Sequence, residues 1–161
     1  MIEHFTATIT TIQTVPHDEQ RYNTAGDWRW VGRKRSDPTL HIFVSRMSDP
    51  CYEFLVAVHE LVEAFLCRQH GVSEEAVTAF DVEFEKRRDE RRRALVSAPP
   101  SIEMASDLEA KLDVLDAEEA GADLRSPYRE EHLVATTVER MLAAYLGVEW
   151  GAYERAISSL S

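Results

Sequence analysis

The fold is decided by the stretch Tyr52-Glu-Phe-Leu-Val-Ala-Val-His-Glu-Leu-Val-Glu-Ala-Phe-Leu-Cys67. It predicts a helix of four to five turns that is apolar around most of its circumference. One continuous apolar face would hold Phe54, Val58, Leu61, Val62 and Phe65, and a narrow solvent arc would hold Glu53, Ala57, Ala64 and Arg68. His59 and Glu63 are four residues apart and point together, away from that arc. Because burying either group unpaired costs several kcal/mol, the sequence predicts a partner for them.

Composition bounds the class of protein. With 161 residues the chain suits one domain with a sizeable core. Its net charge of −11 argues against non-specific nucleic-acid binding and against docking on anionic membranes. No apolar run is long enough to span a bilayer, and the first residues show no secretory signal. Cys51 and Cys67 would lie roughly 24 Å apart on one helix, so two unpaired thiols predict a cytoplasmic protein.

The order of elements predicts an α+β domain in which a small N-terminal sheet packs against a bundle of about five helices. Strands are expected at 2–15, 28–31 and 40–45, and helices at 50–70, 74–96, 101–120, 128–146 and from 150 onward. Within one domain, 1–47 would be mainly β, 49–96 a central helix pair, 100–122 an accessory acidic helix and 127–161 the C-terminal helices.

Residues suited to helix capping predict where the helices begin and end. Asp49 is a suitable N-cap before Pro50, and Gly71 is a suitable C-terminal stop. Gly121 is expected to end the acidic helix and Gly147 the one that Pro127 opens. The last helix carries Trp150, Tyr153, Ile157 and Leu160 at helical spacing.

A basic run, residues 85–93, has two readings. It could form a nucleic-acid patch, or it could be a solvated helix face. It lacks interleaved aromatic residues and the chain is acidic, so the solvated face is favoured.

The chemistry centres on the sequence His59-Glu60-Leu-Val-Glu63. It differs by one residue from His-Glu-x-x-His, in which two residues four apart bind zinc and the Glu between them is the general base. A carboxylate at the fourth position reaches the same point, and Zn²⁺ accepts carboxylate oxygen. The competing interpretation is a buried ion pair that bridges two turns of the helix.

Further ligands would come from other helices. His132 and Glu139 are two turns apart on one side of the 128–146 helix. Asp81 lies on an inward stripe between Val77 and Phe84, where a carboxylate is costly unless it is paired or ligating. Glu83 lies on the same helix but points elsewhere. Which of these residues completes the site stays open.

A strand, this motif on a buried helix and an acidic residue on the next helix resemble the core of zincin metallopeptidases over residues 40–85. The resemblance implies that His59 is the first ligand, Glu60 the base, and Glu63 the replacement for the second His. Asp81 or Glu83 would take the third-ligand position. A site richer in carboxylate is harder and accepts more kinds of metal, so Zn is expected, with Mn or Fe as alternatives.

The chain also resembles a small uncharacterised family found in phage and prophage genomes. The resemblance lies in 20–27, 59–63, Phe80-Asp81, 126–132, Glu139 and 147–150. It groups these residues but implies no known activity.

Three functions compete. The first is a metal-dependent hydrolase of zincin type, a peptidase among the candidates, with an unidentified small-molecule or peptide substrate. The second is a metal-binding or ion-paired domain without catalysis. The third is an interaction module that binds a protein partner through the 101–120 helix. A di-iron bundle is disfavoured, because paired Glu-x-x-His motifs are absent.

Overall fold

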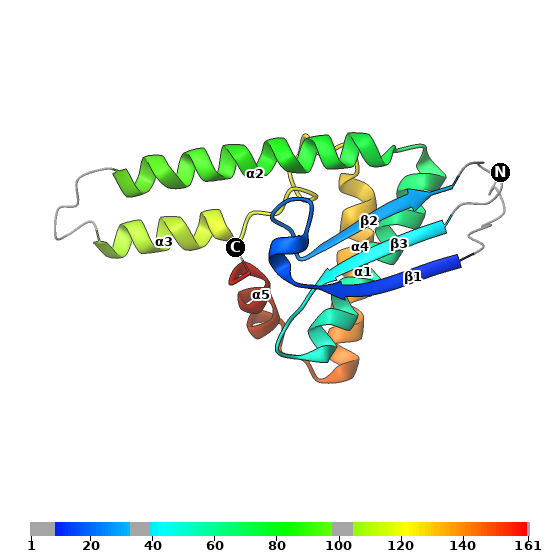
Figure 1. Ribbon diagram of the computed structural model, residues 1–161. Helices are drawn as coiled ribbons and strands as arrows, with labels where there is room; N and C mark the ends of the chain where they lie inside the picture. Colours follow the sequence, from blue (N-terminus) through cyan, green and yellow to red (C-terminus); the bar gives the residue numbers. More distant parts are fainter. Residues whose placement is uncertain (1–8, 33–38, 98–104, 161) are drawn as a thin grey trace.

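The computed structural model describes residues 9–32, 39–97 and 105–160, and it has the predicted α+β architecture. The bounds are β1 Ile9–Val15, a 3₁₀ turn His17–Glu19, β2 Gly26–Val31, β3 Thr39–Ser45, α1 Pro50–His70, α2 Glu74–Ser97, α3 Ala105–Asp116, α4 Arg129–Leu146 and α5 Trp150–Ser158. The part of the first expected strand before Ile9 lies outside the described residues. The three strands form one small sheet beside the helices (Figure 1).

β3 is the central strand of the sheet. It pairs in parallel with β1 and antiparallel with β2. Alternate side chains of β3, those of Leu40, Ile42 and Val44, are buried, as the period of two requires when one face of a sheet is covered. They belong to the apolar core that also contains Leu55 of α1.

α1 begins and ends where the sequence predicts. The Asp49 carboxylate accepts a hydrogen bond from the Cys51 backbone N–H, and Gly71 ends the helix in the left-handed region at φ 77°. The predicted solvent arc is wrong in part. Ala57 and Ala64 are 5% and 0% exposed, whereas Phe54, placed on the apolar face, is 49% exposed. Small alanine side chains let the helix approach the core closely, so in a helix apolar all round they mark a buried side.

α4 packs along α1 in the opposite direction. His59 meets Glu139, and His70, further along α1, meets Glu131 near the start of α4. α4 ends at Gly147 as predicted, with φ 72°. α5 then follows, and its buried Tyr153 packs against Tyr52 of α1. α1 is therefore enclosed between the sheet and α4.

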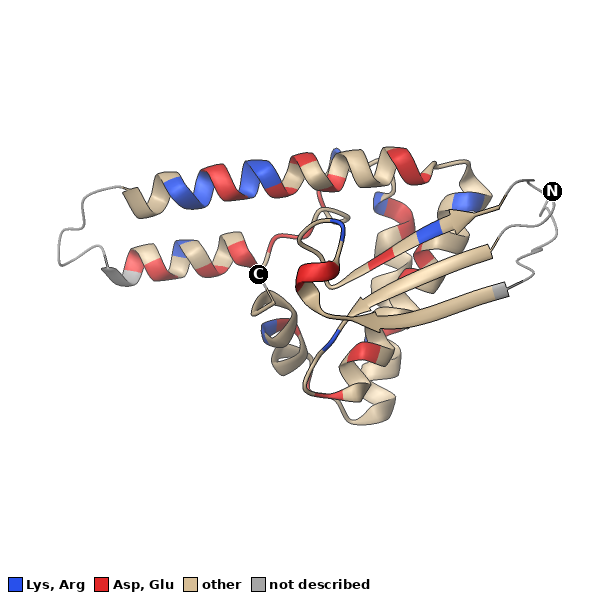
Figure 2. Ribbon diagram, in the orientation of Figure 1, with Lys and Arg blue, Asp and Glu red and all other residues tan. Residues whose placement is uncertain are grey.

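α2 and α3 lie side by side and extend away from the rest of the molecule (Figure 1). The basic run lies along α2 and faces acidic residues of α3 and the turn that follows it (Figure 2). Arg91 pairs with Glu118 and Arg92 with Asp116, and both arginines stay about half exposed, so this part of the run is a solvated helix face that also forms ion pairs.

The acidic helix is shorter than predicted. Residues 101–104 lie outside the described part, and α3 ends at Asp116 rather than at Gly121. Residues 117–126 form turns instead, with backbone bonds such as Glu118 N–H to the Leu115 carbonyl. Leu160, expected in the last helix, lies two residues beyond its end.

Two further observations concern features raised by the sequence. None of the described helices combines the length and the apolar character needed to cross a bilayer. Cys51 and Cys67 are both free thiols, as expected, and Cys67 is buried.

Candidate metal centre

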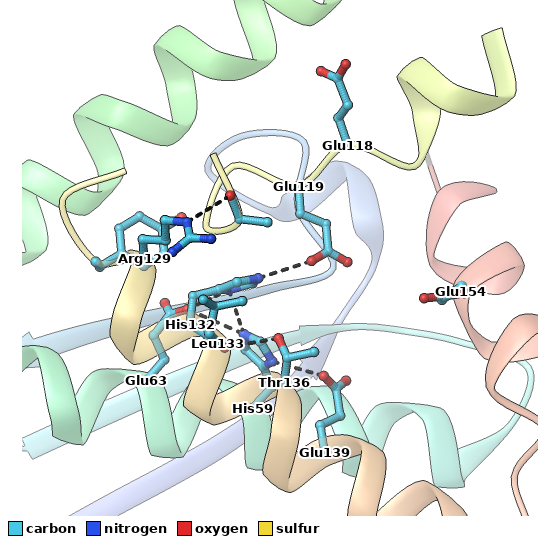
Figure 3. Close-up of polar contacts among 12 residues, drawn as sticks. His59, Glu63, Glu118, Glu119, Arg129, His132, Leu133, Thr136, Glu139 and Glu154 are labelled. Atoms are coloured by element: carbon cyan, nitrogen blue, oxygen red, sulfur yellow. Dashed lines mark hydrogen bonds and ion pairs between the residues drawn. The ribbon is translucent and has the colours of Figure 1, made fainter. Parts of the chain in front are cut away.

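Two side chains of α1 and one of α4 meet inside the helix pair (Figure 3). His132 Nδ1 lies 3.1 Å from His59 Nε2 and 3.1 Å from Glu63 Oε2. The third side of this triangle, His59 Nε2 to Glu63 Oε2, measures 3.4 Å. We call His59, Glu63 and His132 the triad; it is the one group of potential ligands that comes together among the described residues.

The outer nitrogen of each histidine faces a carboxylate. His59 Nδ1 lies 3.0 Å from Glu139, and His132 Nε2 lies 3.1 Å from Glu119. An ionised carboxylate only accepts hydrogen bonds, so both outer nitrogens donate. In a neutral imidazole the other nitrogen then carries a lone pair. Both lone pairs point at each other and at a carboxylate oxygen, an arrangement that requires a cation or added protons.

The dimensions of the triad suit a transition metal. A tetrahedral zinc with bonds of 2.0–2.1 Å separates its ligand atoms by about 3.3–3.4 Å. The observed separations of 3.1, 3.1 and 3.4 Å are close to that value. Two His and one Glu are also the protein ligands of hydrolytic zinc sites that keep a fourth position open.

Trp28 orients the carboxylate of the triad. Its indole N–H donates to Glu63 Oε1 at 3.0 Å, which leaves Oε2 facing the two histidines. Trp28 is 3% exposed and Glu63 is 5% exposed. Each member of the triad therefore has a partner behind it, the arrangement that holds metal ligands in place.

The same contacts set the protonation of the triad without a metal. Burial would lower the pKa of His59, but hydrogen bonds with Glu139 and Glu63 outweigh it and raise that pKa well above its usual value. Burial would likewise raise the pKa of Glu63, but its histidine neighbours lower it to about 2. Protons on the imidazoles supply the positive charge that a metal would otherwise bring.

Two of the predicted ligands lie outside the triad. Glu139 turns toward the outer nitrogen of His59 and also accepts a hydrogen bond from Tyr153. Asp81 accepts hydrogen bonds from the Tyr22 and Tyr128 hydroxyls instead of joining the histidines. Burial raises the pKa of Asp81 to about 7. Glu83 is exposed on α2.

Glu60, the predicted base, lines the same cavity as the triad. Its carboxylate packs so closely on Gly26 that a Cβ added there would lie 2.4 Å from Glu60 Oε1. Burial, together with the charge of Glu63, raises the pKa of Glu60 well above its usual value. A carboxyl group beside a candidate metal site is placed to transfer protons.

Sequence reasoning missed Glu119 and the aromatic partners. The helix predicted over 101–120 would place Glu119 in its last turn, but Glu119 lies in the 117–121 turn, beside His132. A Cβ on Gly121 would lie 2.2 Å from the His132 ring, so this turn needs glycine to approach so closely. Tyr22 and Tyr128 fall within the segments that carry the resemblance to the phage family, and that was the available signal.

Comparison with known proteins adds no name to this geometry: no family model, no curated protein and no solved structure matches the chain.

Proposed function

We propose that the protein binds a divalent transition-metal ion, zinc in the first instance, through His59, Glu63 and His132, and that it is a hydrolase with Glu60 as general base. The observation that carries the proposal is the convergence of two imidazole nitrogens and one carboxylate oxygen while both outer nitrogens face carboxylates. The set of two His and one Glu also admits Mn or Fe.

The proposed ligand set differs from the one that the zincin resemblance implies, because His132 takes the third position in place of Asp81 or Glu83. Zincins take two His from one helix, whereas here α1 supplies one His and one Glu and the second His would come from α4. A metal ion at such a site supplies Lewis acidity, which polarises a carbonyl group and acidifies water. The ligand count leaves room for a substrate in a fourth position.

The residues around the triad would transfer the proton and hold the histidines in place. Glu60 would accept a proton from the attacking water and return it to the leaving group. Glu139 and Glu119 hold the outer N–H groups of the two histidines, which fixes the tautomers that leave the inner nitrogens free. An amide or ester bond is the class of substrate that this arrangement suits.

The first test is elemental analysis of the purified protein beside a His59→Ala/His132→Ala double variant. We expect near-stoichiometric metal in the wild type and its loss in the variant. If the wild type neither holds metal nor takes up added zinc, manganese or iron, the proposal is wrong. The triad would then be an ion-paired cluster that specifies how α1 packs on α4.

The second test separates hydrolysis from simple metal binding. Metal-loaded wild type, Glu60→Gln and Gly26→Ala proteins are compared on pools of fluorescence-quenched peptides and esters. Glu60→Gln should keep its metal and lose activity by roughly 10²–10⁴-fold, the usual contribution of a general base. Gly26→Ala should lose activity too, because the methyl group displaces the Glu60 carboxylate. Full metal occupancy with no activity in any pool would favour the non-catalytic alternative.

A further inference from the structure

A cavity of about 280 Å³ opens beside the triad. Its walls come from His17, the 22–28 segment, α1, α2, residues 116–121, α4, α5 and Leu160. α5 contributes an apolar side to the cavity through Trp150 and Ile157, and Leu160, just beyond the helix, extends it. The volume accommodates one side chain of a substrate together with the group that would be cleaved.

The other walls are acidic. Among the described residues that line the cavity, eleven are Asp or Glu and one, Arg88, is a permanent cation. Arginines pair with six of the eleven: Asp27, Glu74, Glu85, Asp116, Glu118 and Glu154. The five that remain are Glu60, Glu63, Asp81, Glu119 and Glu139, and among the described residues none of the five pairs with an arginine or a lysine.

Two of the five have no basic partner. Glu63, Glu119 and Glu139 each contact a histidine, but Asp81 has only the two tyrosine hydroxyls. For Glu60, no hydrogen bond from the described residues reaches the carboxylate. Asp81 is 7% exposed, and above its pKa of about 7 it carries a charge that water screens poorly. Such walls attract a cation and repel an anion.

We propose that the cavity accepts a substrate with an ammonium or guanidinium group beside the bond to be cleaved, as a basic peptide segment has. The proposal rests on the proposed function. The acidic side of the cavity would hold the charge, and the apolar side on α5 would pack against the aliphatic stem of a lysine or arginine. Phosphate esters and acidic peptides would be disfavoured by the same charges.

The experiment uses benzamidine and benzamide, which have nearly the same shape but differ in charge, and neither needs to be cleaved. Binding to the zinc-loaded full chain is followed by NMR titration and by tryptophan fluorescence, since Trp28 and Trp150 line the cavity. We expect benzamidine to bind roughly tenfold more tightly than benzamide. Equal affinities, or no binding of benzamidine, would overturn the proposal.

Two variants locate the effect in the cavity. At pH 8, above the pKa of Asp81, Asp81→Asn removes one charge, and Glu60→Gln removes one ionisable carboxyl group, each with little change of shape. Each variant should reduce the preference for benzamidine by roughly threefold or more. Glu83→Gln is the matched control, because Glu83 is exposed on α2 and does not line the cavity. An equal loss in Glu83→Gln would indicate attraction by the acidic surface in general and would also overturn the proposal.

Failure of the proposed function would be recognised separately. The elemental analysis and the peptide and ester assays test the proposed function. The preference for benzamidine over benzamide is measured by binding alone and needs no hydrolysis. A protein that holds zinc and hydrolyses esters but prefers benzamide would disprove the cationic substrate alone.

Discussion

The triad and the α2–α3 pair are both built from oppositely charged side chains, yet they differ in almost every physical respect. In the triad, Glu63 is 5% exposed, one of its oxygens accepts the Trp28 N–H, and the other faces His132 Nδ1. In the α2–α3 pair, the side chains of Arg91 and Arg92 are 49% and 48% exposed. Burial without a cation would be costly for the triad, whereas water solvates the charges of the α2–α3 pair in any case.

The comparison teaches where charge indicates function. The basic run is the most conspicuous charge feature of the sequence, and each of its two pairs with α3 and the following turn is worth little. The triad involves one His–Glu pair and a distant histidine, and its position inside the helix pair makes it informative. Four experiments test this contrast, in order of decreasing expected effect.

Removing a triad ligand should have the largest effect. His59→Ala is expected to weaken zinc affinity by at least about 100-fold, since a ligand loss should exceed the 10–100-fold typical of an outer partner. His70→Ala is the matched control, because His70 also lies on α1 and pairs with a glutamate of α4 through one nitrogen. Competition with a chromogenic chelator measures both. Similar losses in the two variants would contradict a specific role for the triad.

The pH dependence of the metal-free protein should show the cost of burying Asp81. Its pKa is raised from 3.8 to about 7 in the folded protein, so the folded state favours the neutral carboxyl group. The contribution of this group to the free energy of unfolding is complete below pH 3.8 and is lost as pH rises through 7. Between pH 5 and 8, the free energy of unfolding of the wild type should fall by about 2–3 kcal/mol relative to Asp81→Asn. Urea titrations in EDTA measure this difference. Parallel pH profiles would mean that Asp81 stays charged.

Replacing the carboxylates of Glu139 and Glu119, which face the outer nitrogens of the histidines, should have the third-largest effect. Glu139→Gln and Glu119→Gln keep the shape of the side chain but replace a carboxylate, which only accepts hydrogen bonds, with an amide, which can turn its NH₂ group toward the histidine. Each should weaken zinc affinity by about 10–100-fold. Glu149→Gln, on the exposed cap of α5, should leave affinity unchanged. If Glu139→Gln lost as much zinc affinity as His59→Ala, Glu139 would be a direct ligand, as the sequence predicted.

The α2–α3 pairs should give the smallest effect. Arg91→Ala and Arg92→Ala are each expected to change the free energy of unfolding by about 1 kcal/mol or less, and by less still in 1 M salt. Chemical denaturation at low and high salt measures both quantities. A salt-independent loss of several kcal/mol in either variant would show that these exposed pairs are structurally critical.

Local rules predicted much of this molecule. Helix spacing placed His59 beside Glu63, and the pairing of two His–Glu sets suggested His132. Asp49, Gly71 and Gly147 fixed helix ends because their caps depend only on near neighbours.

The features that the sequence did not predict depend on which elements pack together in the folded protein. Two helical turns separate His132 from Glu139, so on an antiparallel neighbour they meet opposite sides of the His59 ring, and only His132 reaches the inner nitrogen. The burial of Ala57 and Ala64 depends on what packs against α1. Glu119 joins the site through a turn whose path the sequence pattern does not specify. Whether the chain is a zincin-like hydrolase, or belongs with phage proteins, stays a prediction.

The separation of the triad along the chain also bears on how the protein folds. His59 and His132 are 73 residues apart, and the segment between them includes α2 and α3. Closing so long a loop is slow and entropically costly, and no metal could hold both histidines before α4 docks on α1. A nascent chain that ends before α4 would have one imidazole and one carboxylate, a weak ligand pair. Tight zinc capture would thus report that the C-terminal helices have been synthesised and have docked.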